Sequence, residues 1–264
     1  MPAGGTGLVL RGLRKEPATI GKWHLGWDLT YKEGKAKTVD NIDFTKRVAN
    51  GPTDRGFDYF YGLTSPSGPP HLYMVNDMAE KQPNTRFEES GGGLYKIKGG
   101  IGHSDWSADG MQPHLADKML EYLDENKDSD KPFFLYMALT APHIPLFPSK
   151  EFKGKSKIGD YGDLVMMIDD IVGRVNRKLK EIGKYDNTIV MFAADNGCAG
   201  YINMDRINRK GHYPSYIYRG YKSHGWEGGH RIPFILSWGD RYGHVTDNSV
   251  SYTHLRAHET SQDL

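Results

Sequence analysis

Four short apolar runs most constrain what this chain can fold into: residues 18–20, 133–139, 188–193 and 233–238. Each run is shorter than a typical helix, and its apolar residues lack the strict alternation of a half-buried strand. Runs rich in Ile, Val and Phe are typical of parallel strands in a sheet that is covered on both faces. They therefore predict four buried strands in one mostly parallel sheet.

Two segments have the spacing of helices. Residues 160–183 carry apolar side chains at positions 164, 167, 168, 171, 172, 175, 179 and 182. This stripe predicts an amphipathic helix, with Gly183 placed as its C-terminal cap. A second helix is expected at about residues 113–126. Helices that alternate with strands predict an α/β fold with right-handed crossovers.

The composition excludes several classes of protein. With 264 residues, 38% hydrophobic and 25% charged, the chain can form one sizeable domain, which we assign to residues 1–250. The formal net charge is +1 and the basic residues are scattered, so we expect no nucleic-acid partner. The longest apolar stretch, "PFFLYMAL", is too short for a membrane span. The single cysteine, Cys198, excludes an internal disulfide framework.

Polar residues follow or precede the apolar runs. In an open α/β sheet, ligands bind outside the carboxyl ends of the strands. Lys22 and His24 follow the first run, and His143 follows the second. The remaining candidates flank the third and fourth runs: Asp195, Asn196 and Lys222. We expect all six to share one cleft.

Each of these residues has a simpler interpretation when taken alone. Lys22 could be a solvated lysine, His143 could sit in a proline-shaped turn, and "DNG" is a common turn sequence. Together they offer point charges for a tetrahedral oxyanion, oxygen ligands for calcium and a histidine that can protonate a leaving oxygen. These groups suit the hydrolysis of a sulfate or phosphate ester.

Four motifs in order carry a resemblance to a known family. "GKWHLG", "PFFLYMALTAPHIPL", "DNTIVMFAADNG" and "GYKSHGWEGGHRIPFIL" resemble the signatures of the formylglycine-dependent sulfatases. "RGFDYFYG" is also similar to their sequences, and the resemblance covers about residues 12–250. It implies an alkaline-phosphatase-like α/β fold, with a mostly parallel sheet flanked by helices.

The resemblance implies a role for each candidate. Lys22 and Lys222 would bind the sulfate, and Lys22 would also contact the nucleophile. His24 would hold the hydroxyl of the nucleophile, and His143 would bind the sulfate and protonate the leaving alcohol. Asp195 and Asn196 would be ligands of one calcium ion.

The nucleophile of the family is absent from this sequence. The family places a cysteine or serine in a Cys-x-Pro-x-Arg motif, converted to formylglycine, upstream of the segment that resembles "GKWHLG", and an Asp-Asp pair with further calcium ligands comes before it. Cys198 stands in "DNGCAG" and is interpreted as a small loop or core residue. We expect a fragment, truncated at both ends and inactive alone. Residues 251–264, "SYTHLRAHETSQDL", are expected to be a non-native tail.

Residues 51–107 lack a regular pattern, and "SPSGPPH" and "ESGGG" are typical of turns. A long irregular segment is often functional, so we expect an insertion that determines specificity. Its candidate substrate-binding residues are His71, Asn76, Asp77 and Arg86. The alternative is a surface loop that does not contact the substrate.

The family resemblance implies a sulfated carbohydrate or aryl sulfate as substrate, and a periplasmic, secreted or lysosomal-type location. Three alternatives remain open: a phosphatase or phosphonate hydrolase of the same superfamily, an inactive remnant that binds anions, and a hydrolase built on Cys198. "GKWHLG" with "APH" favours a sulfatase, and no strand-to-helix nucleophile turn precedes Cys198.

Overall fold

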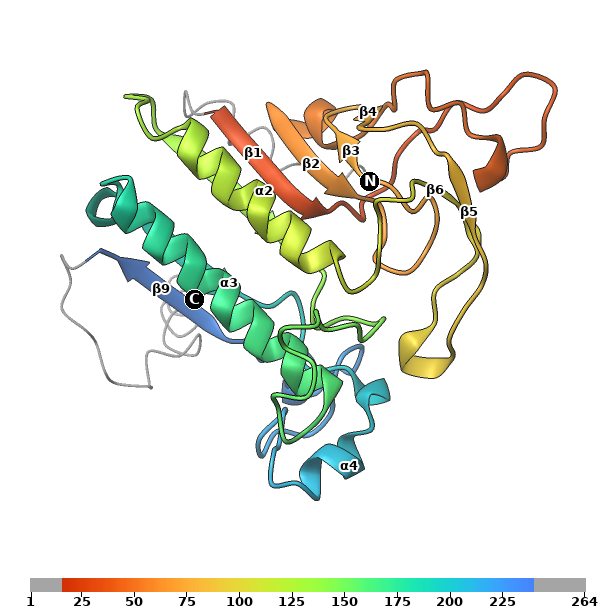
Figure 1. The fold of residues 1–264 in the computed structure, drawn as a ribbon. Helices are drawn as coiled ribbons and strands as arrows, with labels where there is room; N and C mark the ends of the chain where they lie inside the picture. Colours follow the sequence, from red (N-terminus) through yellow and green to blue (C-terminus); the bar gives the residue numbers. More distant parts are fainter. Residues whose placement is uncertain (1–15, 240–264) are drawn as a thin grey trace, which may run out of the picture. The chain divides into compact units, whose positions relative to one another are not determined.

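The computed structural model describes residues 16–239, which divide into two compact units with the boundary between Val175 and Asn176. The first unit contains β1 (Glu16–Lys22), η1 (Val39–Asn41), η2 (Pro52–Arg55), β2 (Tyr59–Leu63), β3 (Met74–Val75), β4 (Met78–Ala79), β5 (Thr85–Phe87), η3 (Gly93–Tyr95), β6 (Gly100–Gly102), α2 (Met111–Glu125) and β7 (Phe133–Ala138) (Figure 1). Helix α3 (Asp160–Glu181) crosses the boundary. The second unit continues with η4 (Tyr185–Asn187), β8 (Ile189–Ala193), η5 (Gly200–Ile202), α4 (Met204–Asn208), α5 (Glu227–His230) and β9 (Phe234–Trp238).

The first unit is built on a five-stranded mixed sheet in the order β4-β3-β2-β1-β7. The first apolar run lies in β1, which pairs in parallel with β2 on one side and with β7 on the other. Strands β3 and β4 extend the sheet in antiparallel pairing. The predicted parallel arrangement of the first and second runs is therefore confirmed.

Strand β2 lies within residues 51–107, for which the sequence predicts no regular structure. That part of the prediction is wrong, because "YFYGL" continues the main sheet and β3 to β6 follow it. The strand is hard to recognise because tyrosine and glycine interrupt its apolar residues. The assignment of this segment to substrate specificity stays a prediction.

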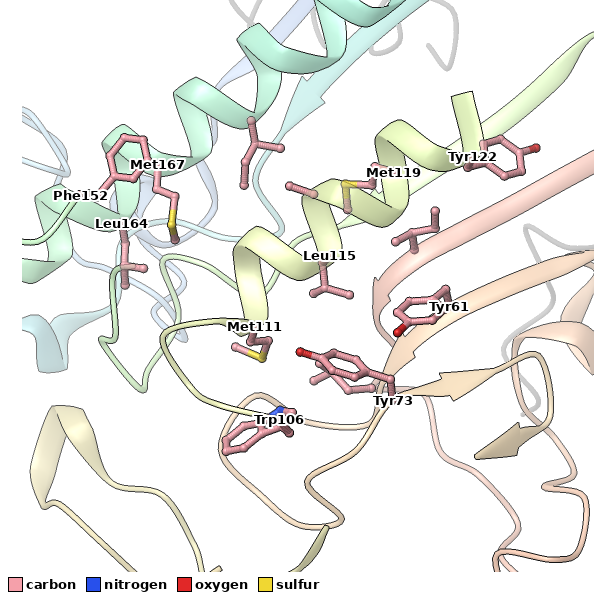
Figure 2. Packing of buried hydrophobic residues seen from close by; sticks show 14 of the residues in the cluster. Tyr61, Tyr73, Trp106, Met111, Leu115, Met119, Tyr122, Phe152, Leu164 and Met167 are labelled. Carbon is pink, nitrogen blue, oxygen red and sulfur yellow. The ribbon is translucent and has the colours of Figure 1, made fainter. Parts of the chain in front are cut away.

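The two faces of the five-stranded sheet have separate cores. Helix α2 runs along β1 and β2 (Figure 1), and its side chains Leu115 and Met119 lie beside Tyr61 of the sheet (Figure 2). Ile20 of β1 belongs to the same core cluster. On the other face, Phe60 belongs to a second cluster. The other members of this cluster come from segments that follow β1 in the sequence. The members of the second cluster are Trp23, Ile42, Phe44, Val48, Phe57, Phe60, Leu72 and Met74.

Both predicted helices are present. Helix α2 begins two residues before the expected start and ends one residue before the expected end. The apolar stripe of α3 is largely buried, as the spacing predicts: Leu164, Met167, Ile168, Ile171, Val175 and Leu179. Gly183 has a φ of 68°, and the next amide, of Lys184, donates to the carbonyl oxygen of Leu179 at 2.9 Å. This left-handed cap confirms the predicted end of the helix.

In the second unit, β8 and β9 pair with each other in antiparallel orientation. The sequence predicts buried parallel strands here, so the prediction is right about the strands and wrong about their direction and burial. Met191 is 62% exposed and Ile235 is 59% exposed. Within residues 16–239 this sheet has two strands, so side chains that alternate in direction leave one set facing outward.

The described residues form an α/β fold with a mixed sheet and flanking helices. No helix among residues 16–239 is long and apolar enough to cross a membrane. The expected non-native tail, residues 251–264, lies outside the described residues.

Candidate active site

The first motif leaves the sheet at the carboxyl end of β1. Lys22 is the last residue of the strand and lies opposite Leu63 of β2. The amide of Trp23 donates to the carbonyl oxygen of Leu63 at 2.9 Å, and its indole is buried in the second core cluster. Because successive side chains of an extended chain alternate, Lys22 and His24 project away from the side that Trp23 packs on. Lys22 is half-buried and His24 is exposed.

Glycine is required just before Lys22. Gly21 has a φ of 132°, and a Cβ there would overlap the carbonyl oxygen of Ala138 in β7. Across the other side, a Cβ on Gly62 would overlap the carbonyl oxygen of Gly21. The three parallel strands β7, β1 and β2 therefore approach one another backbone to backbone at the edge where the motif begins.

His143 follows β7 and leaves the sheet at the same edge. Strand β7 is parallel to β1, with Ala138 in register with Gly21, so the connection that carries His143 starts beside Lys22. The His143 amide donates to the Thr140 carbonyl at 3.0 Å. Its Nδ1 lies 2.6 Å from the carbonyl oxygen of Ile144, which can only accept, so Nδ1 carries a proton and Nε2 is the atom for chemistry.

Gln112 supports this connection, and the sequence prediction missed it. Gln112 lies in the first turn of α2 and is 2% exposed. With the amide oxygen facing β7, it accepts from the Thr140 hydroxyl at 2.6 Å, from the Thr140 amide at 3.1 Å and from the Ala141 amide. In the sequence, Gln112 lies at helical spacing from the apolar residues Leu115 and Met119. A polar residue on a buried helix face needs a hydrogen-bond partner, and this pattern could have identified it.

In the second unit, a backbone hydrogen bond joins the segment of Asp195 and Asn196 to the segment of Lys222. Asp195 is exposed and Asn196 is half-buried in the loop after β8. The Lys222 amide donates to the Cys198 carbonyl at 2.8 Å, which holds Lys222 beside this loop. Cys198 is half-buried, and its Sγ lies 4.0 Å from the Sδ of Met204. The predicted assembly of residues from both units in one cleft stays a prediction.

The oxygen ligands that Asp195 and Asn196 offer after β8 are of the type that calcium binds, but they are too few to hold the ion alone. Asp195 and Asn196 offer a carboxylate and an amide oxygen, while calcium takes roughly six to eight oxygen ligands. The Asn196 Nδ2 donates to the carbonyl of Gly197 at 2.9 Å, which orients the amide group. In the described part of the chain, no group of three or more His, Cys, Asp or Glu side chains is placed to hold a metal ion.

His71, a predicted substrate ligand, is enclosed in the protein. It is 1% exposed, its Nε2 lies 2.7 Å from the carbonyl oxygen of Lys98, and its ring packs against Phe87 and Trp106. Burial lowers the pKa of His71, because a charged imidazole would lose its hydration. Its enclosure opposes direct contact with a substrate.

The other three predicted substrate ligands have three separate partners. Asn76 has a φ of 54°, and its Oδ1 accepts from the amide of Phe60 at 2.9 Å. Asp77 forms an ion pair with Arg47. Arg86 pairs with Asp40 at 2.7 Å. Their part in substrate binding stays a prediction.

Comparisons with known proteins agree with one another. The family model described as Sulfatase matches residues 9–260. An N-acetylgalactosamine-6-O-sulfatase of Bacteroides thetaiotaomicron is 30% identical, with 83% of this chain and 48% of that protein covered. An N-acetylgalactosamine-6-sulfatase of Homo sapiens is also 30% identical, with 88% of this chain and 38% of that protein covered.

Solved structures show the same relationship. A structure from the glycosaminoglycan metabolism of Bacteroides thetaiotaomicron has a TM-score of 0.69 and 27% identity, covering 87% of this chain and 53% of that one. A sulfatase from Pseudoalteromonas sp. has a TM-score of 0.60 and 26% identity, covering 88% of this chain and 44% of that one. The chain spans about half the length of these proteins or less.

Proposed function

Because the chain belongs to the sulfatase family, we propose that it is part of an enzyme that hydrolyses sulfate esters of carbohydrates. The observation that carries this proposal is the parallel pairing of β7 with β1. It starts the connection to His143 beside Lys22, so a cation and a titratable imidazole leave the sheet at one edge. Such a pair suits an anionic ester whose leaving oxygen needs a proton.

Each candidate catalytic residue of the first unit has a chemical role in this proposal. The Lys22 ammonium stabilises the negative charge on the sulfate oxygens, which grows in the transition state. Because Nδ1 already carries a proton, His143 acts as the doubly protonated imidazolium: it donates the proton on Nε2 to the ester oxygen as the bond from that oxygen to sulfur breaks, and becomes a neutral imidazole. The hydrogen bond from Nδ1 to the Ile144 carbonyl fixes the orientation of the ring. His24 positions the hydroxyl of the nucleophile.

We propose that the nucleophile, a formylglycine, comes from outside these 264 residues. The single cysteine, Cys198, packs near Met204 in the loop after β8 and lacks the Cys-x-Pro-x-Arg context. Without a nucleophile the chain alone forfeits covalent catalysis and turns over no ester. In the complete enzyme, Lys222 binds the sulfate as a second cation.

Asp195 and Asn196 would supply two of the ligands of a calcium ion, and other segments would supply the remaining ligands. When bound, calcium would withdraw negative charge from the sulfate group. The carboxylate and amide of these residues are the donor types that calcium prefers.

The substrate class follows from the relatives. Both N-acetylgalactosamine sulfatases named above act on a sulfated amino sugar by their names, and the solved relative comes from glycosaminoglycan metabolism. These names support a sulfated carbohydrate over a simple aryl sulfate as the natural substrate.

The direct test uses the longer protein that carries this chain. We expect Lys22→Ala to lower kcat/KM for a sulfated sugar by about 10²-fold or more, because a charge contact to the oxyanion is lost. Lys127→Ala is the matched control, since this exposed lysine pairs with Asp124 after α2. The longer protein would also be assayed with an aryl sulfate and the matching aryl phosphate. Faster hydrolysis of the phosphate would replace the sulfatase proposal with a phosphatase.

His143→Ala should affect poor leaving groups most. A sugar alkoxide needs a proton as it leaves, while a nitrophenolate needs it far less, so the sugar sulfate should lose more activity. Turnover of both esters would be measured at one pH. Equal losses on the two substrates would remove His143 from the role of acid.

A further inference from the structure

A hollow in the first unit is unused by the proposed mechanism. It has a volume of about 340 Å³ and is lined mainly by polar and aromatic side chains: Tyr73, Glu80, Lys81, His103, Asp105, Trp106, His114 and Lys118. A volume of this size is at the lower end of roughly 300–1,000 Å³ for small-ligand sites.

A hydrogen-bond chain fixes which groups the hollow offers. The hydroxyl of Tyr61 lies 2.8 Å from Glu80 Oε2 and 2.6 Å from His114 Nε2. A carboxylate only accepts, so Tyr61 donates to Glu80 and accepts from the N–H at Nε2 of His114. Burial raises the pKa of Tyr61 and lowers the pKa of His114, so the hydroxyl stays protonated and the imidazole neutral. Nδ1 of His114 is therefore an acceptor.

The cations around the hollow are already paired. Lys81 forms an ion pair with Asp105, and Lys118 lies 2.8 Å from Glu121. Within residues 16–239, the carboxylate of Glu80 takes a hydrogen bond from Tyr61 and forms no ion pair. The hollow thus presents Glu80 and His114 as acceptors while both of its lysine ammonium groups are paired, which favours a ligand that donates hydrogen bonds over an anion.

The hollow lies on the same face of the sheet as Lys22. Tyr61 is in register with Ile20, and both side chains belong to the core under α2. Lys22 is two residues further along β1, so its side chain projects from that face about 7 Å beyond the level of Tyr61. Trp106 and Tyr73 lie together beside the start of α2 in this core (Figure 2).

We propose that this hollow binds a neutral, hydroxyl-bearing sugar ring, the neighbour of the sulfated ring that Lys22 holds. Two adjacent hydroxyls donate to the carboxylate of Glu80 and to Nδ1 of His114. The half-buried ring of His114 is held in place by Tyr73, with the two ring centroids 4.3 Å apart, so its Nδ1 acceptor has a fixed position at the wall of the hollow. The identity of the sugar as a neighbour of the sulfated ring rests on the proposed function.

The test measures binding without turnover. The 264-residue chain is titrated with methyl β-galactoside, N-acetylgalactosamine and inorganic sulfate, and the bound ligands are detected by NMR. We expect both neutral sugars to bind and sulfate not to displace them. Glu80→Ala should weaken sugar binding by at least about tenfold, because a charged hydrogen-bond acceptor is lost.

Two further variants separate binding from folding. His114→Phe keeps an aromatic ring against Tyr73 but removes the Nδ1 acceptor, and should weaken binding as Glu80→Ala does. Glu89→Ala is the control, because this exposed acid pairs with Lys96 and does not line the hollow. No sugar binding by the unsubstituted chain, equal binding by Glu80→Ala, or displacement by sulfate would overturn the proposal. Since no nucleophile or metal is needed, absence of sulfatase activity in the longer protein would count against the proposed function alone.

Discussion

Strands β1 and β8 come from similar apolar runs and reach opposite degrees of burial. Ala18 and Ile20 of β1 are 0% exposed, while Ile189 and Met191 of β8 are 47% and 62% exposed. Strand β1 has a parallel neighbour on each side and a core on each face, whereas β8 has one neighbour among the residues described, the antiparallel strand β9. An apolar run therefore predicts that a strand forms, while the number of its neighbours determines how far it is buried.

The largest effect should come from the backbone contact beside β1. Gly21→Ala adds a Cβ that overlaps the Ala138 carbonyl at a φ of 132°, so we expect a loss of about 3–5 kcal/mol. Gly26→Ala is the control, because Gly26 also has a positive φ, 92°, and no atom within 4 Å of the added Cβ. Urea unfolding of both variants checks this. Equal losses would show that strain at positive φ, and not strand contact, determines the cost.

Truncation of core side chains should sharpen the comparison between the units. Leu115→Ala empties a site that is 0% exposed under the five-stranded sheet, and should cost about 3 kcal/mol. Met191→Ala, on the exposed side of β8, should change stability by less than about 0.5 kcal/mol. Hydrogen exchange resolved by segment measures both. A large loss for Met191→Ala would mean that β8 is covered in solution.

The next effect concerns the connection before His143. Gln112→Met keeps the volume but leaves the Thr140 and Ala141 donors without an acceptor, so we expect about 2 kcal/mol of lost stability. Gln112→Glu still offers an oxygen and should retain slow exchange of both amides. In the second unit, Thr188→Val removes one half-buried hydrogen bond, from the Thr188 hydroxyl to the Lys184 carbonyl, and should cost about 1 kcal/mol. If Met and Glu behaved alike at position 112, the residue would act through packing only.

The smallest effect is a dependence on pH. Burial lowers the pKa of His71 and of His114 in the folded protein, so the unfolded chain binds more protons as the pH falls below about 6.5. Stability contributed by neutral His71 is thus present above that pH and is lost below it. His71→Phe should flatten the fall by at most about 1.4 kcal/mol per pH unit. Denaturant midpoints measured from pH 7.5 to 5 give the slope, and an unchanged slope would mean that His71 contributes nothing.

Much of the sheet could be predicted from the sequence, and its connections could not. Each apolar run marks a strand, because local hydrophobicity determines where a strand can form. The direction of β9 depends on its pairing with β8, which no local pattern encodes. Strand β2 was missed because its tyrosines pack under α2, a contact between segments distant in the sequence.

The candidate site divides in the same way. The departure of Lys22 and His143 from one edge of the sheet could be predicted, because strand ends mark a ligand edge in α/β sheets; their part in a site stays a prediction. Gln112 escaped prediction because its partners lie after another strand. His71 was interpreted as a loop residue, but its bridge to Gly102 and the rings of Phe87 and Trp106 enclose it. Polarity of a segment predicts exposure only where nothing packs over it.

The backbone contact among Gly21, Gly62 and Ala138 has an evolutionary consequence. At this edge β7, β1 and β2 touch without side chains between them, so the spacing of these three strands cannot be adjusted by exchanging residues of different size. Substitutions in the loops that follow these strands can change which ligand is recognised, while the three strands themselves keep the same spacing. In a saturation library of this chain, positions 21 and 62 should retain glycine alone, while Gly92, with an extended φ of −160° and no atom within 4 Å of an added Cβ, should accept many residues.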